Sequence, residues 1–421
     1  MKLIAVFVEN IVGEWRAVFS DLPGCKARAF NLVATIQLAM CFYLAAFPAA
    51  ASRITVESSF NRILIVDPSP ALSDYLAGRG FAIERFEQLE AFHLTLTVAV
   101  PPDGVETDAA MRDLRMWFPN AIVARDTWFQ VATDGRADRS NASDLTRILA
   151  AIKWQSPNSA SAAGTRVGMI DSSLDPDHPA LQGAAIVRRQ FTSGHASTTD
   201  TTHGTAIAAM LVGRSDARSV SGLLRGATLF YAGIFQDTAH GPRASSVDFL
   251  RAVNWLIQSG VTVINASVTS PSKNPVMLLA MSRLRHERVI LVAAVGNNGP
   301  AGSPVYPAAI PAAFAVTAVS ATGNAYPYAN IGHYIDIAAP GIDVPTTSRR
   351  IMSGTSVSVP FVTAAVARMV QRCGLSPLEA ENSLQGNARD LGPRGWDARF
   401  GWGLLQMQPS CGQPGRTIAN R

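Results

Sequence analysis

The sequence predicts an α/β protein in which a three-layer domain with a mostly parallel central sheet follows a small α+β domain. Beyond Gly164, apolar segments such as "TRVGMID", "VTVINAS" and "RVILVAAVGN" are separated by helical stretches such as "VDFLRAVNWLIQSG". Strands that are apolar along their whole length and alternate with helices are typical of a parallel sheet covered on both faces. Residues 60–131 show shorter strand and helix patterns between prolines and glycines, which predicts a separate α+β domain.

The composition indicates a folded protein with a large core. Of the 421 residues, 48% are hydrophobic and 16% are charged. The 36 basic and 31 acidic residues give a net charge of +5, without a block of like charge or a basic stripe. We therefore expect no nucleic-acid partner, and we expect a monomer.

The first 51 residues contain a candidate targeting segment. Residues 30–51, "FNLVATIQLAMCFYLAAFPAAA", carry no charge and end in small residues. This pattern predicts an export signal or a membrane anchor, and so a secreted, periplasmic or membrane-tethered protein. The extension before it, residues 1–29 with "EWRAVFSDLPGC", resembles the amino end of HicB-type antitoxins, in which case the apolar run is a packed helix after three short strands. A misassigned start codon is a third interpretation.

The four cysteines agree with export. Removal of a signal ending near Ala51 would leave only Cys373 and Cys411. These two residues either form a disulfide that ties the tail, residues 409–421, to the last helix, or remain as two buried thiols. Residues 132–163 read as a linker and processing region, with a polar stretch, a helical segment near 145–154 and the exposed connection "SPNSASAAG".

Three polar residues stand where ligands gather in such sheets, at strand ends and helix starts. Asp171 ends the strand "TRVGMI", His203 opens the helix "HGTAIAAMLVG", and Ser356 lies in "SGTSVSVP", with Pro360 in or near the first turn of the next helix. Each alone is an ordinary turn former or helix cap. Together they follow the order Asp, His, Ser, which is one of the chain orders of the acyl-transfer triad. In that chemistry a serine attacks, an imidazole takes its proton and a carboxylate orients the imidazolium.

Three motifs make the interpretation specific. "DSSLDPDHP", "HGT" and "GTSVSVP" occur in this order over residues 164–408, and this part of the chain resembles the subtilisin-like serine proteases, or subtilases. The resemblance implies a subtilisin-like fold and a serine endopeptidase. It also implies that Asn297, in "GNNG", forms an oxyanion hole with the backbone N–H of Ser356. The alternative for Asn297 is a simple tight turn.

The chain departs from the family pattern at several positions. Val357 replaces the usual Met after the serine, which predicts lower sensitivity to oxidation. The segment with Ser267, Val268 and Thr269 matches the strand that pairs with substrate, but it lacks the usual glycines, and Val305 stands where the family often has a glycine at the base of the pocket before the scissile bond. Bulk at both walls predicts a preference for small residues such as Ala or Ser there.

The resemblance further implies that residues 60–131 are a ferredoxin-like propeptide, which assists folding, blocks the groove and is removed by self-processing between Gln130 and Gly164. The expected partners are protein or peptide substrates and this propeptide. No cofactor is expected and no metal site is assigned, because Asp216 is the one acid in the loop where subtilases often bind calcium.

Two other functions fit the same sequence. The chain could be a catalytically silent relative that binds peptides, or a protease fused to an antitoxin-like regulatory module. The intact set of Asp171, His203, Ser356 and Asn297 favours an active enzyme.

Overall fold

The computed structural model describes residues 59–66, 69–132, 145–154, 162–192, 197–214, 219–347 and 350–407, with the backbone alone at 59 and 60. The chain divides into two units, Met1–Glu57 and Ser58–Arg421. The predicted antitoxin-like extension, the apolar segment 30–51 and the tail 409–421 lie outside the described residues. Everything below concerns the second unit.

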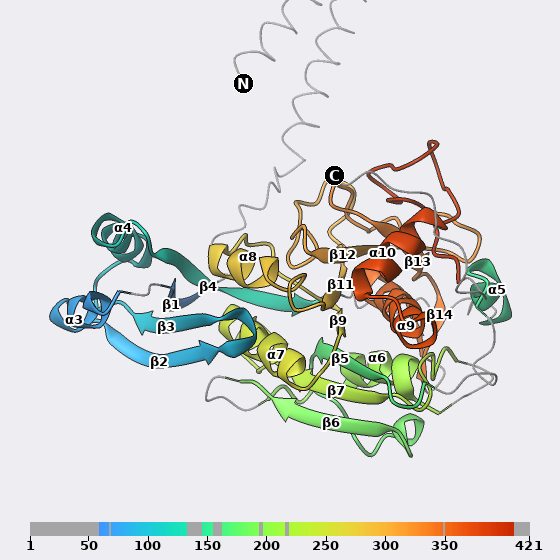
Figure 1. Ribbon diagram of the computed structural model, residues 1–421, viewed down its shortest axis with the longest axis horizontal. Helices are drawn as coiled ribbons and strands as arrows, with labels where there is room; N and C mark the ends of the chain where they lie inside the picture. The colour runs from blue at the N-terminus through green and yellow to red at the C-terminus, as the bar shows by residue number, and fades with distance from the viewer. Residues whose placement is uncertain are drawn as a thin grey trace, which may run out of the picture. The chain divides into compact units, whose positions relative to one another are not determined.

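A seven-stranded parallel sheet forms the centre of the larger domain (Figure 1). Its order is β13-β12-β11-β9-β5-β7-β6, and every neighbouring pair is parallel. The strands are β5 (Arg166–Asp171), β6 (Ala185–Gln190), β7 (Thr228–Gly233), β9 (Val263–Ala266), β11 (Ile290–Ala294), β12 (Ala313–Val319) and β13 (Ile337–Pro340). Four of them, β9, β11, β12 and β13, are buried along their whole length, as the continuous apolar runs predict.

Helices cover both faces of this sheet. One core contains residues of α6 (Thr202–Val212), α9 (Thr355–Cys373) and α10 (Pro377–Gly386). The other core contains residues of α7 (Ser246–Gln258) and α8 (Pro275–Ser282). Since neighbouring strand residues alternate between the two cores, as Met169 and Ile170 do, the sheet is the middle layer of three. The predicted three-layer α/β fold is confirmed.

The smaller domain has the element order of a ferredoxin-like unit. Its elements are β1 (Ser59–Val66), α3 (Ala71–Gly78), β2 (Ala82–Leu89), the short helix η1 (Glu90–Phe92), β3 (Leu94–Val100), α4 (Thr107–Trp117) and β4 (Ile122–Val131). The strands pair in the order β4-β1-β3-β2, and all of these pairs are antiparallel. Helix α4 buries Ala110, Met111 and Leu114, spaced so that they share one face, against Ile63 and Ile65 of β1.

The helical segment after this domain packs into the larger core. Helix α5 (Leu145–Ala151) is shorter than predicted from the sequence, and Ile148, Ile152 and Trp154 are buried in the same core as α9. The backbone carbonyl of Ile152 accepts a hydrogen bond from the N–H of Met407 at 2.8 Å. Residues 145–154 of the predicted linker region are therefore a packed part of the larger domain.

Short strands complete the larger domain. They are β8 (Ala244–Ser245), β10 (Val268–Thr269), β14 (Val344–Pro345) and β15 (Ile351–Met352), and η3 (Pro179–Leu181) is a single helical turn.

None of the helices in the described ranges is long and apolar enough to cross a bilayer. Cys373 is disulfide-bonded. The other three cysteines, Cys25, Cys41 and Cys411, lie outside the described residues.

Candidate active site

Asp171 and His203 form a buried pair at the carboxyl end of the sheet. Asp171 is the last residue of β5, and His203 lies in the first turn of α6. Nδ1 of His203 is 2.7 Å from Oδ1 of Asp171, and the N–H of Ser172 donates to the same oxygen at 2.7 Å. Because Asp171 accepts from Nδ1, the neutral ring carries its lone pair on Nε2, which is the form that a general base needs.

The turn after Asp171 is held tightly against the start of α6. Gly204 donates its N–H to Oγ of Ser172 at 3.2 Å, and a Cβ at Gly204 would lie 2.4 Å from the carbonyl oxygen of Ser173. Only glycine permits this approach. On the other side, the buried hydroxyl of Tyr231 donates to the carbonyl of Ser172. Burial, and secondly the charge of Asp171, raise the pKa of Tyr231 well above 10, so this hydroxyl remains a donor.

Ser356 lies in the first turn of α9 with its side chain buried. The helix is preceded by Gly354 at φ 141°, a conformation that other residues rarely adopt. Among the described residues, neither Oγ of Ser356 nor Nε2 of His203 has a hydrogen-bond partner. Buried polar atoms are normally paired, so two unpaired atoms of these types are consistent with a site that engages a reactant. Pro360 lies inside α9, one turn beyond Ser356 and so near the first turn of the helix, as expected.

The ends of three adjacent strands bring the site together. β5 neighbours β9, and β9 neighbours β11, so the segments after Asp171, Ala266 and Ala294 lie in a row. The hydroxyl of Ser267, which follows β9, donates to the backbone carbonyl of Ser356 at 3.0 Å. This bond ties the start of α9 to the strand next to the one that ends in Asp171.

Asn297 lies between α9 and the end of the smaller domain. Its Oδ1 accepts from the N–H of Thr355 at 3.0 Å, and its Nδ2 donates to the carbonyl of Ala132 at 2.7 Å. A Cβ at Gly354 would lie 3.1 Å from Nδ2 of Asn297, 3.5 Å from the Ala132 oxygen and 3.7 Å from Oγ of Ser356. These three atoms therefore lie within 3.7 Å of one point, and the Ala132 carbonyl is bonded there to the amide of Asn297.

The end of β4, which leads to Ala132, pairs with two short antiparallel strands. Strand β4 pairs with β8 through Trp128 and Phe129, and with β10 through Gln130 and Val131. The N–H of Ala132 donates to the carbonyl of Ser267 at 3.0 Å. The predicted substrate-binding residues Ser267, Val268 and Thr269 thus lie along this strand. Val305, 2% exposed, packs its Cγ2 3.0 Å from the point where a Cβ on Gly296 would be.

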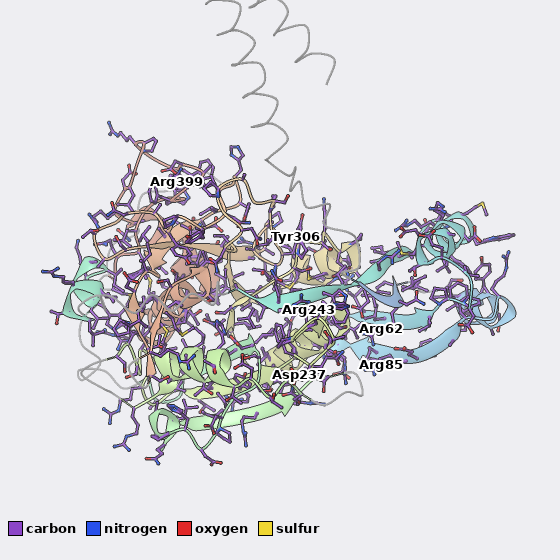
Figure 2. All side chains as sticks on the ribbon, turned by 180° about the vertical axis from the view of Figure 1, so that it is seen from behind. Arg62, Arg85, Asp237, Arg243, Tyr306 and Arg399 are labelled. Carbon is purple, nitrogen blue, oxygen red and sulfur yellow. The ribbon has the colours of Figure 1, made fainter. Side chains whose placement is uncertain are left out.

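Two contacts of β4 carry no sequence signal of their own. The ring of Phe129 is fully buried and stacks on Phe249 of α7, with centroids 4.7 Å apart and planes at 10°. The carboxylate of Asp126, also fully buried, accepts from Ser245 and Ser246 at the start of α7 and from Arg62 of β1. Figure 2 labels Arg62 on the smaller domain. Both Phe129 and Asp126 look like ordinary members of an alternating strand, because their partners lie 64 or more positions away in the sequence.

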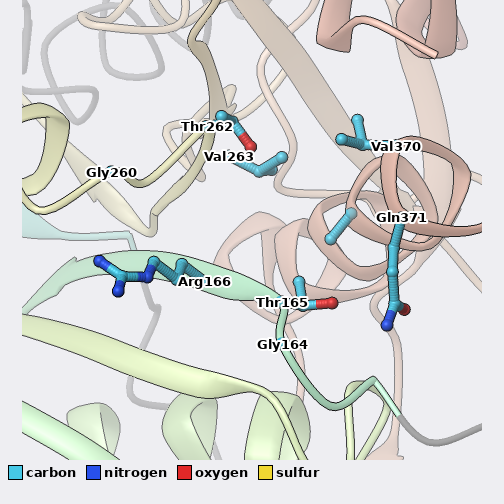
Figure 3. Close-up of a pocket in the computed structure, with 9 residues that line it drawn as sticks. Gly164, Thr165, Arg166, Gly260, Thr262, Val263, Val370 and Gln371 are labelled. Atoms are coloured by element: carbon cyan, nitrogen blue, oxygen red, sulfur yellow. The ribbon is translucent and has the colours of Figure 1, made fainter. Parts of the chain in front are cut away.

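A hollow lies away from these residues. Figure 3 shows a cavity of about 210 Å³ at the amino ends of β5 and β9, lined by residues that include Arg166, Val263 and Gln371. It is at the opposite end of the strands from Asp171.

In the part of the chain that the structure describes, no three His, Cys, Asp or Glu residues are grouped to hold a metal ion. Asp216 lies outside that part.

Comparison with known proteins identifies the family. Residues 162–403 match the model of the subtilase family, Peptidase S8. The chain belongs to the subtilase family. As a member of it, the protein is a serine endopeptidase.

Individual relatives agree. The chain is 28% identical to Subtilisin DY of Bacillus licheniformis over 258 residues, covering 59% of this chain and 91% of that protein. It is 30% identical to Subtilisin Savinase of Lederbergia lenta over 254 residues, covering 58% and 90%. The solved structure of fervidolysin from Fervidobacterium pennivorans matches 86% of this chain and 62% of its own, with a TM-score of 0.70 and 18% identity. At that identity it shows the fold alone, over more of the chain than the family model covers.

Proposed function

We propose that this subtilase is made as a self-processing precursor, in which Ser356 attacks the carbonyl of Ala132 and hydrolyses the bond to Thr133. The observation that carries the proposal is the position of Ala132. Its carbonyl accepts from the side-chain amide of Asn297, and its N–H donates to the carbonyl of Ser267. A segment of the chain itself thus lies against the candidate site as an extended substrate would.

We assign each residue a role in this reaction. His203, oriented by Asp171 at 2.7 Å, takes the proton of Ser356 through Nε2 as Oγ bonds to the carbonyl carbon of Ala132. Negative charge then develops on the carbonyl oxygen, which the amide of Asn297 and the backbone N–H of Ser356 stabilise. The protonated imidazole next gives its proton to the leaving nitrogen of Thr133. Water hydrolyses the acyl-enzyme by the same steps in reverse.

The identity of Ala132 supports the expected preference for small residues before the scissile bond. Its side chain is in the large core at 3% exposure, and Val305, where the family often has glycine, fills space beside Gly296. We propose the same preference for protein and peptide substrates.

The contacts of the smaller domain support its role as an inhibitory propeptide. The backbone pairing of β4 with two short strands, β8 and β10, and the buried Phe129 and Asp126 hold it on the larger domain. The N–H of Ala91 also donates to Asn254 of α7 at 2.9 Å. After cleavage these contacts remain, so the domain would continue to occupy the groove until it is degraded or released.

We also propose that the protein is exported. Residues 30–51 have the composition of a signal or anchor, and Cys373 is disulfide-bonded. Disulfides persist mainly in oxidising compartments, so the bonded cysteine agrees with a secreted or periplasmic location. Amino-terminal sequencing of the cell-associated and exported forms would identify the first residue of each.

A fluorophosphonate probe tests the proposed activity. We expect it to label the matured protein at Ser356 and to leave the Ser356→Ala protein unlabelled. That variant should remain at precursor length, whereas the wild type should yield a product that begins at Thr133 or, after trimming, later. A wild-type protein that folds, resists the probe and cleaves no peptide would instead be a peptide-binding relative.

A further inference from the structure

We infer that Ser267 is a positioning residue for the nucleophile, through its side chain, in addition to binding substrate through its backbone. This inference rests on the proposed function. It concerns one hydrogen bond, from Oγ of Ser267 to the backbone carbonyl of Ser356, at 3.0 Å.

Pro360 explains why the carbonyl of Ser356 needs this donor. In an α-helix the carbonyl of residue 356 accepts from the N–H of residue 360. Residue 360 is proline, which has no N–H, and it lies inside α9. Ser356 is fully buried, so water is not at hand to replace the missing donor. The hydroxyl of Ser267 supplies a hydrogen bond to that carbonyl.

The hydroxyl of Ser267 is itself held in place. Nδ2 of Asn265, on β9, donates to it at 3.0 Å, which leaves its own proton for the carbonyl of Ser356. Oδ1 of Asn265 accepts from the hydroxyl of Thr363, on α9, at 3.2 Å. All four residues are fully buried. The chain of bonds therefore leaves α9 at Ser356, crosses the end of β9 and returns to α9 at Thr363.

The same residue also binds the backbone N–H of Ala132, the residue whose carbonyl is attacked. The backbone oxygen of Ser267 accepts from the N–H of Ala132, whose carbonyl lies at Asn297. Ser267 thus contacts the residue to be cleaved with its backbone and the turn that carries the nucleophile with its side chain. Fixing both partners of a reaction to one rigid point limits their relative motion, and displacements of about 1 Å in such sites can cost about 100-fold in rate.

Replacement of Ser267 and Pro360, singly and together, tests this arrangement. We expect Ser267→Ala to lower kcat and the rate of fluorophosphonate labelling roughly tenfold, because a buried carbonyl loses its donor. KM should change little, since the backbone bond to substrate remains. In the double variant with Pro360→Ala, the N–H of residue 360 can bond to Ser356, and we expect a large part of the lost rate to return.

The protein for these measurements is the matured enzyme expressed from the full chain. The Pro360→Ala single variant completes the cycle, and Ser267→Thr, which keeps a hydroxyl, is the matched control and should stay well above Ser267→Ala. Equal labelling rates in wild type and Ser267→Ala, or no recovery in the double variant, would overturn the inference. If the wild type is not labelled at all, the proposed activity fails instead.

If Ser267→Ala does not fold, a second variant still tests the inference. Thr363→Val removes the far donor of the chain and keeps the shape of the side chain. We expect it to lower kcat by about threefold, because the hydroxyl of Ser267 is then held less firmly through Asn265. A rate and a melting temperature both equal to those of the wild type would count against the bonded chain.

Discussion

Replacement of Asp126 by asparagine should loosen the smaller domain from the larger one. The carboxylate accepts from Nε and Nη2 of Arg62 at 2.9 and 2.6 Å, from Oγ of Ser245 at 3.0 Å, and from the N–H and Oγ of Ser246 at 3.0 and 2.7 Å. Asp126→Asn keeps the shape but turns one oxygen into a donor that faces other donors. It also leaves the guanidinium of Arg62, whose side chain is 9% exposed, without its main counter-charge.

The expected loss of stability follows from the burial of this ion pair. Removing one partner of a buried ion pair typically costs about 3 to 5 kcal/mol. At roughly 2 °C per kcal/mol, the value for domains of about 150 to 250 residues, the melting temperature should fall by about 6 °C or more. The assay is thermal unfolding of the full-length precursor with Ser356→Ala, so that processing does not interfere.

An exposed ion pair of the same domain is the control. Nη2 of Arg125 lies 2.7 Å from Oδ1 of Asp108, whose side chain is 52% exposed. Asp108→Asn should cost less than about 1 kcal/mol, because solvent screens such pairs. In the active enzyme, Asp126→Asn should also shorten the lag before activity appears. Equal melting temperatures for the two variants would refute the reasoning.

Four further predictions concern the active site and the stability of the larger domain. Asn297→Ala should lower kcat by roughly 100- to 1000-fold with little change in KM, because the amide acts on charge that develops in the transition state; peptide hydrolysis measures both, and a change in KM alone would contradict it. Ala132→Phe should slow conversion of precursor to mature protein on a gel, while Gln130→Ala, at an exposed position, should not. Val357→Met should make activity sensitive to hydrogen peroxide, whereas the wild type should keep its activity after the same treatment. Burial raises the pKa of Glu381 from 4.5 to about 8 against the attraction of Arg285, with repulsion from Asp336 adding to it. The protonated carboxyl of Glu381 therefore contributes fully to stability below pH 4.5, and this contribution is lost as the pH rises through 8. Each unit of pKa shift corresponds to about 1.4 kcal/mol of free energy of unfolding. Glu381→Gln in the Ser356→Ala background should flatten the fall in melting temperature over that range, and identical pH profiles would contradict the assignment.

The sequence by itself was sufficient to predict the parallel sheet and the polar residues at the carboxyl ends of its strands. Strands such as β11 and β13 are apolar throughout because both faces are covered, and that pattern is visible along the chain. Asp171 and His203 could be chosen because each follows or opens a regular element, where local motifs specify the turn. The structure brings these two residues within 2.7 Å of each other.

Tertiary structure alone decided what meets at the start of α9. Asn297 binds the carbonyl of Ala132 across 165 positions, and Ser267 bonds to Ser356 across 89. The strands that hold Ala132, β8 and β10, are each two residues long, too short to produce a periodic pattern. Their pairing with β4 uses backbone N–H and carbonyl groups, and every residue except proline has both. The amino-acid types in these strands therefore do not indicate which strands pair. Only the folded chain shows which backbone groups come within hydrogen-bonding distance of one another once the core is packed.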